Sequence, residues 1–235
     1  MPYRQGSLAT SPGAPGCCGG GRPDEEARGP LPGDDVTPQP RLQSTRAITI
    51  DASPEQVWPW IVQMGFERAG FYTHEWVERM LANPRYVEGH NATRIHPQLQ
   101  DLKVGDLIPY GVGAYARVHE IESYSHLVAA EAWVLRPLPD GRTRLIVRYR
   151  GMGFIAPAMQ AITPEGPPAM RAIAYAVARI PGLLLLARGI DFFVGDPLHH
   201  YMEVGMLRGI KDRAERVVAV KQPPAGMEEH DVATG

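Results

Sequence analysis

A four-residue spacing of apolar side chains dominates the chain from Asp196 to Val218. On a helix this spacing gathers the apolar positions on one face, while the charged residues lie mostly elsewhere and are predicted to be solvated. Asp196 and Pro197 suit the N-cap and the first helical position, so the pattern predicts a helix of about six turns that begins there. The apolar positions are Leu198, Met202, Met206, Leu207, Ile210, Ala214, Val217 and Val218.

Alternating apolar and polar positions upstream predict strands. The first runs from Ser44 to Asp51 with Ile48 and Ile50 on one side, and Pro139-Asp140-Gly141 is a turn signal between the last two. One side of the last run is rich in arginine, which is typical of an antiparallel sheet with one solvated face. The other strands are predicted at about 104–109, 114–121, 126–131, 132–138 and 142–150.

Two helices are predicted between the first strand and the others. Ser53 followed by Pro54 and Gln56 forms a capping box that starts a helix ending near Gly65. A second helix is predicted from Thr73 to the Asn83-Pro84 pair. Its predicted inner stripe is Trp76, Val77, Met80 and Leu81.

An apolar segment, residues 151–195, precedes the last helix and carries few charges. It predicts two short helices, at about 167–179 and 182–193, and no run reaches the roughly 18–20 apolar residues that span a membrane. Three interpretations of residues 154–195 stay open. The segment is extra core, a lid over a cavity, or a membrane contact through an apolar surface that carries arginines.

Composition places the chain among ordinary globular proteins, with 44% hydrophobic and 21% charged residues and a net charge of −2. Such a charge gives no support to nucleic-acid binding. The two cysteines, Cys17 and Cys18, are adjacent, so no disulfide framework is expected, and without a visible secretory signal a cytoplasmic location is predicted. Residues 1–43 and 222–235 are predicted to be disordered tails around one domain, 44–221.

Four stretches carry a resemblance to a known superfamily. They are VWPWIVQMGFERAGFY (57–72), LQDLKVGDLIP (99–109), TRLIVRYR (143–150) and MLRGIKDRAE (206–215). Together with the element order, they make residues 45–220 similar to an uncharacterised bacterial subfamily of the SRPBCC (START-like, polyketide cyclase/dehydrase) superfamily. The resemblance implies an α+β helix-grip fold, in which a curved antiparallel sheet wraps around the long C-terminal helix and encloses a hydrophobic cavity.

Candidate chemistry is limited to acid–base and binding roles. The chain has no Gly-x-Ser-x-Gly nucleophile and no phosphate-binding loop. His199 and Glu203 are four residues apart, as metal ligands can be, but no third ligand accompanies them, so neither a metal nor a cofactor is expected. The cavity candidates are Gln63, Met64, Tyr72, His74, Trp76, Tyr110, Trp133, Arg148, Met202, Glu203 and Met206.

Each candidate also has a purely structural interpretation. A buried tyrosine hydroxyl or glutamine amide is usually satisfied by nearby backbone. Arg148 also fits a solvent-facing strand position, and the methionines also fit an ordinary core.

The favoured function is binding of a hydrophobic small molecule or lipid by a carrier or sensor. Members of the superfamily bind lipids, sterols and polyketides, and some catalyse cyclisation or dehydration. One alternative is therefore a cyclase/dehydratase-like enzyme that uses cavity Tyr, His or Arg groups for proton transfer. The other is a peripheral membrane protein that transfers lipid through residues 154–195. No nucleic-acid partner is expected, and the oligomeric state is left open.

Overall fold

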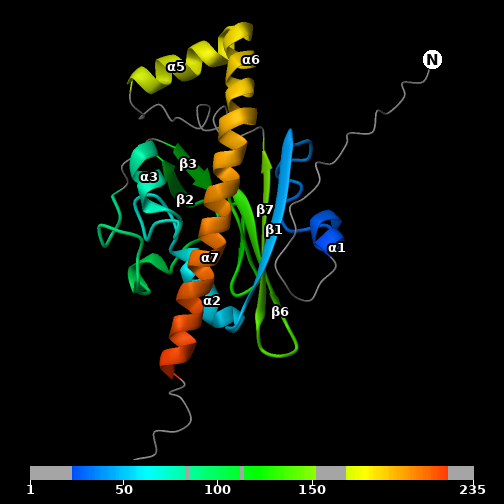
Figure 1. Ribbon diagram of the computed structural model, residues 1–235, viewed down its shortest axis with the longest axis vertical. Coiled ribbons are helices and arrows are strands. Elements are labelled where there is room, and N and C mark those ends of the chain that lie inside the picture. The colour runs from blue at the N-terminus through cyan, green and yellow to red at the C-terminus, as the bar shows by residue number, and fades with distance from the viewer. Residues whose placement is uncertain (1–22, 83–84, 112–113, 152–167, 222–235) are drawn as a thin grey trace, which may run out of the picture.

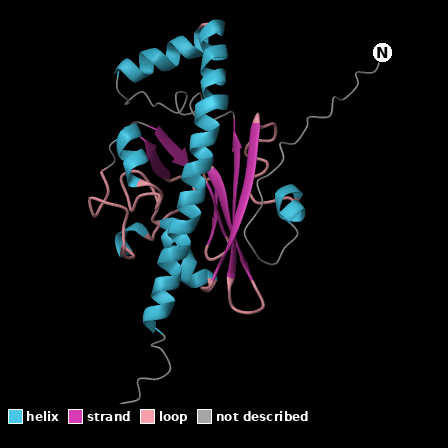
Figure 2. Cartoon of the chain, viewed as in Figure 1, coloured by secondary structure: helices cyan, strands magenta, loops and turns pink. Residues whose placement is uncertain are grey.

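The structure is a computed structural model that describes residues 23–82, 85–111, 114–151 and 168–221 (Figures 1 and 2). Its helical elements are α1 (Pro23–Arg28), α2 (Pro54–Val62), α3 (Glu75–Ala82), the 3-10 turn η1 (Pro97–Leu99), α5 (Pro168–Arg179), α6 (Pro181–Ile190), the π-helical turn η2 (Asp191–Gly195) and α7 (Asp196–Lys221). Its strands are β1 (Leu42–Ile50), β2 (Leu107–Gly111), β3 (Ala114–Arg117), β4 (Glu120–Glu122), β5 (His126–Val128), β6 (Glu131–Pro137) and β7 (Thr143–Gly151).

Five strands form one antiparallel sheet in the order β1-β7-β6-β5-β4, and β2 and β3 form a separate antiparallel pair. The strand predicted over 114–121 is therefore two strands that belong to different sheets. The long helix α7 crosses one face of the large sheet (Figure 1). An α+β fold with an antiparallel sheet and a long C-terminal helix is thus confirmed.

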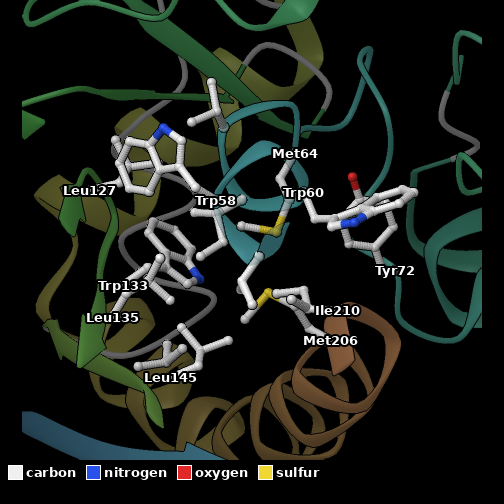
Figure 3. Packing of buried hydrophobic residues seen from close by; sticks show 14 of the residues in the cluster. Trp58, Trp60, Met64, Tyr72, Leu127, Trp133, Leu135, Leu145, Met206 and Ile210 are labelled. Carbon is white, nitrogen blue, oxygen red and sulfur yellow. The ribbon is translucent and has the colours of Figure 1, made fainter. Parts of the chain in front are cut away.

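The main core lies between the sheet, α2 and α7. The predicted stripe of α7 supplies Met206, Leu207, Ile210 and Ala214, all of them buried. In Figure 3, Met64 and Met206 approach each other at the centre of this core, with Trp58 and Trp133 to one side and Trp60 and Tyr72 to the other. These large side chains fill most of the space beneath the C-terminal half of α7, where the resemblance predicts a cavity.

The long helix α7 begins at Asp196, as predicted, but Asp196 does not act as its N-cap. The helical elements α6, η2 and α7 follow one another without a break, and in Figure 1 they form a continuous rod. The carboxylate of Asp196 instead accepts a hydrogen bond from Arg41 at 3.4 Å. The π-helical turn η2 inserts an extra residue per turn at this junction, and such turns frequently mark functional sites.

Residues 23–41 pack on the face of the sheet opposite α7, so this part of the predicted disordered tail is ordered. Leu31 is buried against Val134 and Ile146, which point away from the main core. The carboxylate of Glu26 pairs with Arg144 at 2.7 Å. The apolar and polar contacts together cover a face that the arginine-rich alternation alone predicts to be solvated.

The inner stripe predicted for α3 is wrong at two positions. Val77 is buried, but Trp76 is 62% exposed and Met80 is 66% exposed. In this helix the carboxylate of Glu78 occupies the buried side, where it accepts a hydrogen bond from the hydroxyl of Tyr86. Burial raises the pKa of Glu78 to about 7.

The two helices predicted in the apolar segment are confirmed as α5 and α6, with nearly the expected bounds. They project from one end of the molecule, beyond the end of the sheet (Figure 1). Predictions for residues 154–166 lie outside the described residues. Among the described helices, none combines the length and the hydropathy that crossing a bilayer requires.

Candidate functional site

An open pocket lies beneath the N-terminal half of α7, beside the filled core. We call it the α7 pocket. Its volume is about 90 Å³, well below the roughly 300–1,000 Å³ of pockets that hold drug-sized ligands. With the side chains as they lie in the structure, the pocket accommodates a molecule of few heavy atoms. Met202 and Met206 in its wall have flexible side chains, whose movement would enlarge the pocket. Its lining residues are Phe71, Thr73, Tyr110, Glu131, His199, Met202, Glu203 and Met206.

The positions of these side chains follow from local periodicity. His199, Met202, Glu203 and Met206 are separated by three and four residues, so they share the face of α7 that meets the sheet. Glu131 begins β6 and alternates with Trp133, which points into the main core. The walls of the pocket are therefore one face of α7, Glu131 on the inner face of the sheet, Tyr110 of β2, and Phe71 and Thr73 of the connection between α2 and α3.

A buried carboxylate and an imidazole meet at the pocket wall. The Oε1 atom of Glu131 lies 3.0 Å from Nε2 of His199. Burial favours the neutral imidazole, but the hydrogen bond to Glu131 and its charge outweigh burial and raise the pKa of His199. The pair therefore holds a proton on His199 more firmly than an isolated histidine does.

Glu203 is the second carboxylate of the site, and its side chain is almost fully buried. Its Oε2 atom pairs with Arg46 and accepts a hydrogen bond from Ser44 at 3.4 Å. Burial raises the pKa of Glu203 to about 7, with a further contribution from the charge of Glu131. Arg46 opposes this shift but does not cancel it, so near neutral pH Glu203 exchanges a proton readily.

Three residues that line the pocket each have a buried polar atom with no hydrogen-bond partner among the described residues. These atoms are the hydroxyl oxygens of Tyr110 and Thr73 and the Oε1 atom of Glu203. Burial, reinforced by the charge of Glu131, keeps the Tyr110 hydroxyl protonated by raising its pKa. Each unsatisfied group costs about 1–3 kcal/mol, and native structures retain few such groups outside functional sites.

Several predicted residues have structural roles elsewhere. The side-chain amide of Gln63 donates to the hydroxyl of Tyr72 at 2.8 Å, and its Oε1 accepts from the backbone N–H of His96 at 2.9 Å. This fully satisfied network anchors the connection after α3 to the core. Met64 and Trp133 belong to the core, where the Trp133 indole N–H has no partner among the described residues.

Arg148 does not face the pocket. It is 2% exposed and lies on the opposite face of the sheet, where it donates to Thr45 at 2.9 Å and to Asp34 at 2.8 Å. It also binds three carbonyl oxygens of the N-terminal segment. Arg148 is therefore neither a cavity group nor a solvated strand residue, because residues 23–41 cover it. Trp76 also lies away from the pocket, exposed on α3.

His74 and Tyr72 line a second groove, on the other side of α7, of about 380 Å³. The His74 ring stacks on Tyr201 with 4.3 Å between ring centroids. The guanidinium of Arg213 crosses the floor of the groove, lies 4.5 Å from the centroid of the Tyr72 ring and donates to the carbonyl of Ala92. The aromatic rings and the guanidinium of this groove thus already have partners, whereas Thr73, which lines both this groove and the α7 pocket, has a buried hydroxyl without a partner among the described residues.

Of the predicted cavity residues, the structure brings Tyr110, Met202, Glu203 and Met206 together. Phe71, Thr73 and Glu131 of the pocket were not predicted from the sequence, and His199 was considered only as a metal ligand. Two sequence patterns could have identified residues near this site. The alternation that points Ile48 and Ile50 inward also points Ser44 and Arg46 inward, and the alternation of β6 points Glu131 inward.

The cluster suits proton transfer and polar recognition better than metal binding. Among the described residues, no group of three or more His, Cys, Asp or Glu side chains is placed to hold a metal ion. The pocket instead offers a hydroxyl, a carboxyl and a hydrogen-bonded imidazole beside apolar walls. Such a combination can orient a small apolar molecule by one polar group.

No protein-family model matches the chain, and no curated protein matches it. Two solved structures are similar over most of their length. Protein MLL2253 from Mesorhizobium loti has a TM-score of 0.33 and 13% sequence identity, with 74% of this chain and 98% of that chain covered. The KanY protein has a TM-score of 0.28 and 12% identity, with 75% and 99% covered. Neither likeness assigns a family.

Proposed function

We propose that the protein binds a small, largely apolar molecule with one oxygen-containing group in the α7 pocket, as a carrier or sensor. The observation that carries the proposal is that three residues of a largely apolar pocket, Tyr110, Thr73 and Glu203, each have a buried polar atom without a hydrogen-bond partner among the described residues. A ligand with a hydroxyl or carbonyl group would satisfy them, and its apolar part would lie against Phe71 and the methionines. Ligand binding would then recover the free energy that these buried groups cost.

We further propose that the fold is the helix-grip fold of the SRPBCC superfamily. The element order and the packing of α7 across the inner face of an antiparallel sheet support this assignment. The small volume of the pocket favours single-ring or shorter ligands over sterols and long-chain lipids.

Phenol and benzene are matched probes for the binding proposal, since they differ only by a hydroxyl group. We expect phenol to bind roughly fivefold more tightly than benzene, because one hydrogen bond is worth about 1 kcal/mol net. Ligand titrations followed by NMR of the full chain measure both affinities. Equal affinities, or no binding of either probe at millimolar concentration, would contradict the proposal.

Tyr110→Phe tests the role of the orphan hydroxyl without changing the side-chain volume appreciably. The variant should weaken phenol binding about fivefold and leave benzene binding unchanged. It should also stabilise the ligand-free protein by about 1 kcal/mol or more, because it removes an unsatisfied buried group. Tyr115→Phe is the matched control, since Tyr115 lies on the neighbouring strand with its side chain exposed, and both affinities should stay as in the wild type.

A second candidate function is acid–base catalysis on the bound molecule. The observation that favours it is Glu203, whose pKa of about 7 suits a group that gives and takes protons near neutral pH. Its neighbour Tyr110 supports the same role. The Tyr110 hydroxyl could donate a hydrogen bond to a carbonyl oxygen of the ligand while Glu203 removes a proton from the carbon next to that carbonyl group.

Hydrogen–deuterium exchange at the α-carbons of cyclohexanone reports such proton transfer without knowledge of the natural substrate. The protein should accelerate exchange, the rate should rise with pH around 7 as Glu203 ionises, and Glu203→Gln should abolish the acceleration. If Glu203→Gln exchanges as fast as the wild type, the pocket serves binding alone.

A further inference from the structure

We propose that the arm formed by α5, α6 and η2, residues 168–195, docks on the surface of an anionic lipid bilayer. This inference concerns a surface separate from the α7 pocket, and it does not depend on what the pocket binds. It selects one of the three interpretations that the sequence leaves open for this segment.

The arm exposes large apolar side chains that no described residue covers. Leu185 is 68% exposed and Phe193 is 77% exposed, and the arm projects from the end of the molecule (Figure 1). Contiguous exposed apolar surface of this kind marks an interaction site rather than ordinary surface. The exposed large apolar residues of the arm are Ile173, Tyr175, Ile180, Leu183, Leu185, Leu186, Ile190, Phe192, Phe193 and Val194.

The charges of the arm identify the partner. Between Glu165 and Asp191 the only charged residues are three arginines, Arg171, Arg179 and Arg188. With Asp191 included, the arm carries three arginines and one carboxylate, and apolar side chains with such an excess of arginine match the acyl boundary and the phosphates of anionic lipids. A second copy of the same arm would instead bring together two segments that each carry excess positive charge, which disfavours self-association.

Aromatic rings provide the anchors. Arg179 donates to the hydroxyl of Tyr175 at 3.2 Å, so a basic and an amphipathic group lie together on α5. Phe192 and Phe193 form an edge-to-face pair with 5.0 Å between centroids, at the junction between the arm and α7. Because the described helices of the arm are too short and interrupted to cross a bilayer, the geometry fits a helix pair that lies in the interface.

Docking at this junction would bring the bilayer close to the α7 pocket. His199 and Met202 line the pocket within the first two turns of α7, directly after Phe192 and Phe193 in the same rod.

Flotation of the full chain with phosphatidylcholine vesicles, with and without phosphatidylglycerol, tests the proposal. Phe192→Ser combined with Phe193→Ser should lower the affinity for the anionic vesicles about hundredfold, since two exposed phenylalanines lose their burial in lipid. Trp76→Ser combined with Met80→Ser is the matched control, because it removes two equally exposed apolar side chains from α3. The control should bind as the wild type does.

Arg171→Gln and Arg179→Gln provide a test that does not alter apolar surface. Each should weaken binding to anionic vesicles about fivefold, and added salt should weaken binding of the wild type. The proposal is overturned if the wild type floats equally with both vesicle types, if it floats with neither, or if the phenylalanine variant matches the control. It is also overturned if sedimentation shows a dimer that the phenylalanine variant dissociates without any vesicle binding.

The vesicle experiment is independent of the pocket experiment. It uses no pocket ligand, and Tyr110→Phe should leave vesicle affinity unchanged. Failure of phenol to bind would therefore leave this inference standing, and failure to float would leave the pocket proposal standing.

Discussion

Replacing Glu203 by glutamine removes a charge that burial disfavours, and the effect on the free energy of unfolding should depend strongly on pH. In the unfolded chain the carboxyl titrates near its ordinary pKa of 4.5, whereas in the folded protein the pKa is about 7. Between these values the folded protein holds a proton that the unfolded chain has released. The stability due to Glu203 is therefore complete below about pH 4.5 and is lost as the pH rises to about 7.

The size of this loss follows from the pKa difference. One pKa unit corresponds to about 1.4 kcal/mol, so the wild type should lose about 3 kcal/mol from this group alone. Glu203→Gln cannot ionise. The difference in unfolding free energy, variant minus wild type, should thus rise by about 3 kcal/mol between about pH 4.5 and pH 8. Glutamine also changes the contacts to Arg46 and Ser44, but that effect on the free energy of unfolding is nearly the same at every pH. It therefore shifts the whole difference curve and does not alter its rise with pH.

Urea unfolding followed by tryptophan fluorescence measures these free energies, since Trp133 and Trp58 are buried in the native core. Glu55→Gln is a control of opposite sign, because a hydrogen bond with Ser53 lowers the pKa of Glu55. That variant should lose stability relative to the wild type as the pH rises through the acid range. A flat difference for Glu203→Gln across the whole range would refute the argument, because it would mean that burial does not hold the Glu203 proton.

Two further predictions concern stability. Arg148→Met should lower the free energy of unfolding by about 3–5 kcal/mol in urea titrations, because it removes five hydrogen bonds, to Thr45, Asp34 and three carbonyl oxygens, and leaves Asp34 only the longer ion pair with Arg150 at 3.6 Å; a loss below about 1 kcal/mol would mean that the N-terminal segment contributes little to the fold. Gly209→Ala should destabilise by at least about 1–3 kcal/mol, because its Cβ would lie 2.0 Å from the carbonyl oxygen of Tyr72. The control Gly189→Ala meets no atom within 4 Å and should be neutral or slightly stabilising, as melting curves would reveal.

The fold was largely predictable because its signals are local. Four-residue spacing in α7, the capping box at Ser53 and two-residue alternation in β1 and β7 each arise from neighbouring residues. The capping hydrogen bond is present, with Gln56 accepting from the backbone N–H of Ser53 at 2.9 Å. The errors arise where a distant segment decides the outcome. Trp76 and Met80 lie on the outer side of α3 because Glu78 and Tyr86 pair on its inner side.

The pocket was predictable only in part. Periodicity placed Met202, Glu203 and Met206 on the inward face of α7, because a helical face is a property of spacing. Periodicity could not predict that Glu131 pairs with His199, because the two residues are 68 positions apart in the chain.

The amino-acid sequence by itself determined most of the helices and strands and the apolar sides of α7, β1 and β7. Only the tertiary structure decided that tryptophans pack beneath the C-terminal half of α7, that the N-terminal segment buries Arg148, and that two carboxylates act on one histidine. The physical reason is range: helical and strand periodicity act between neighbours in sequence, whereas burial, and with it the pKa of Glu203, depends on every segment that excludes water from the site.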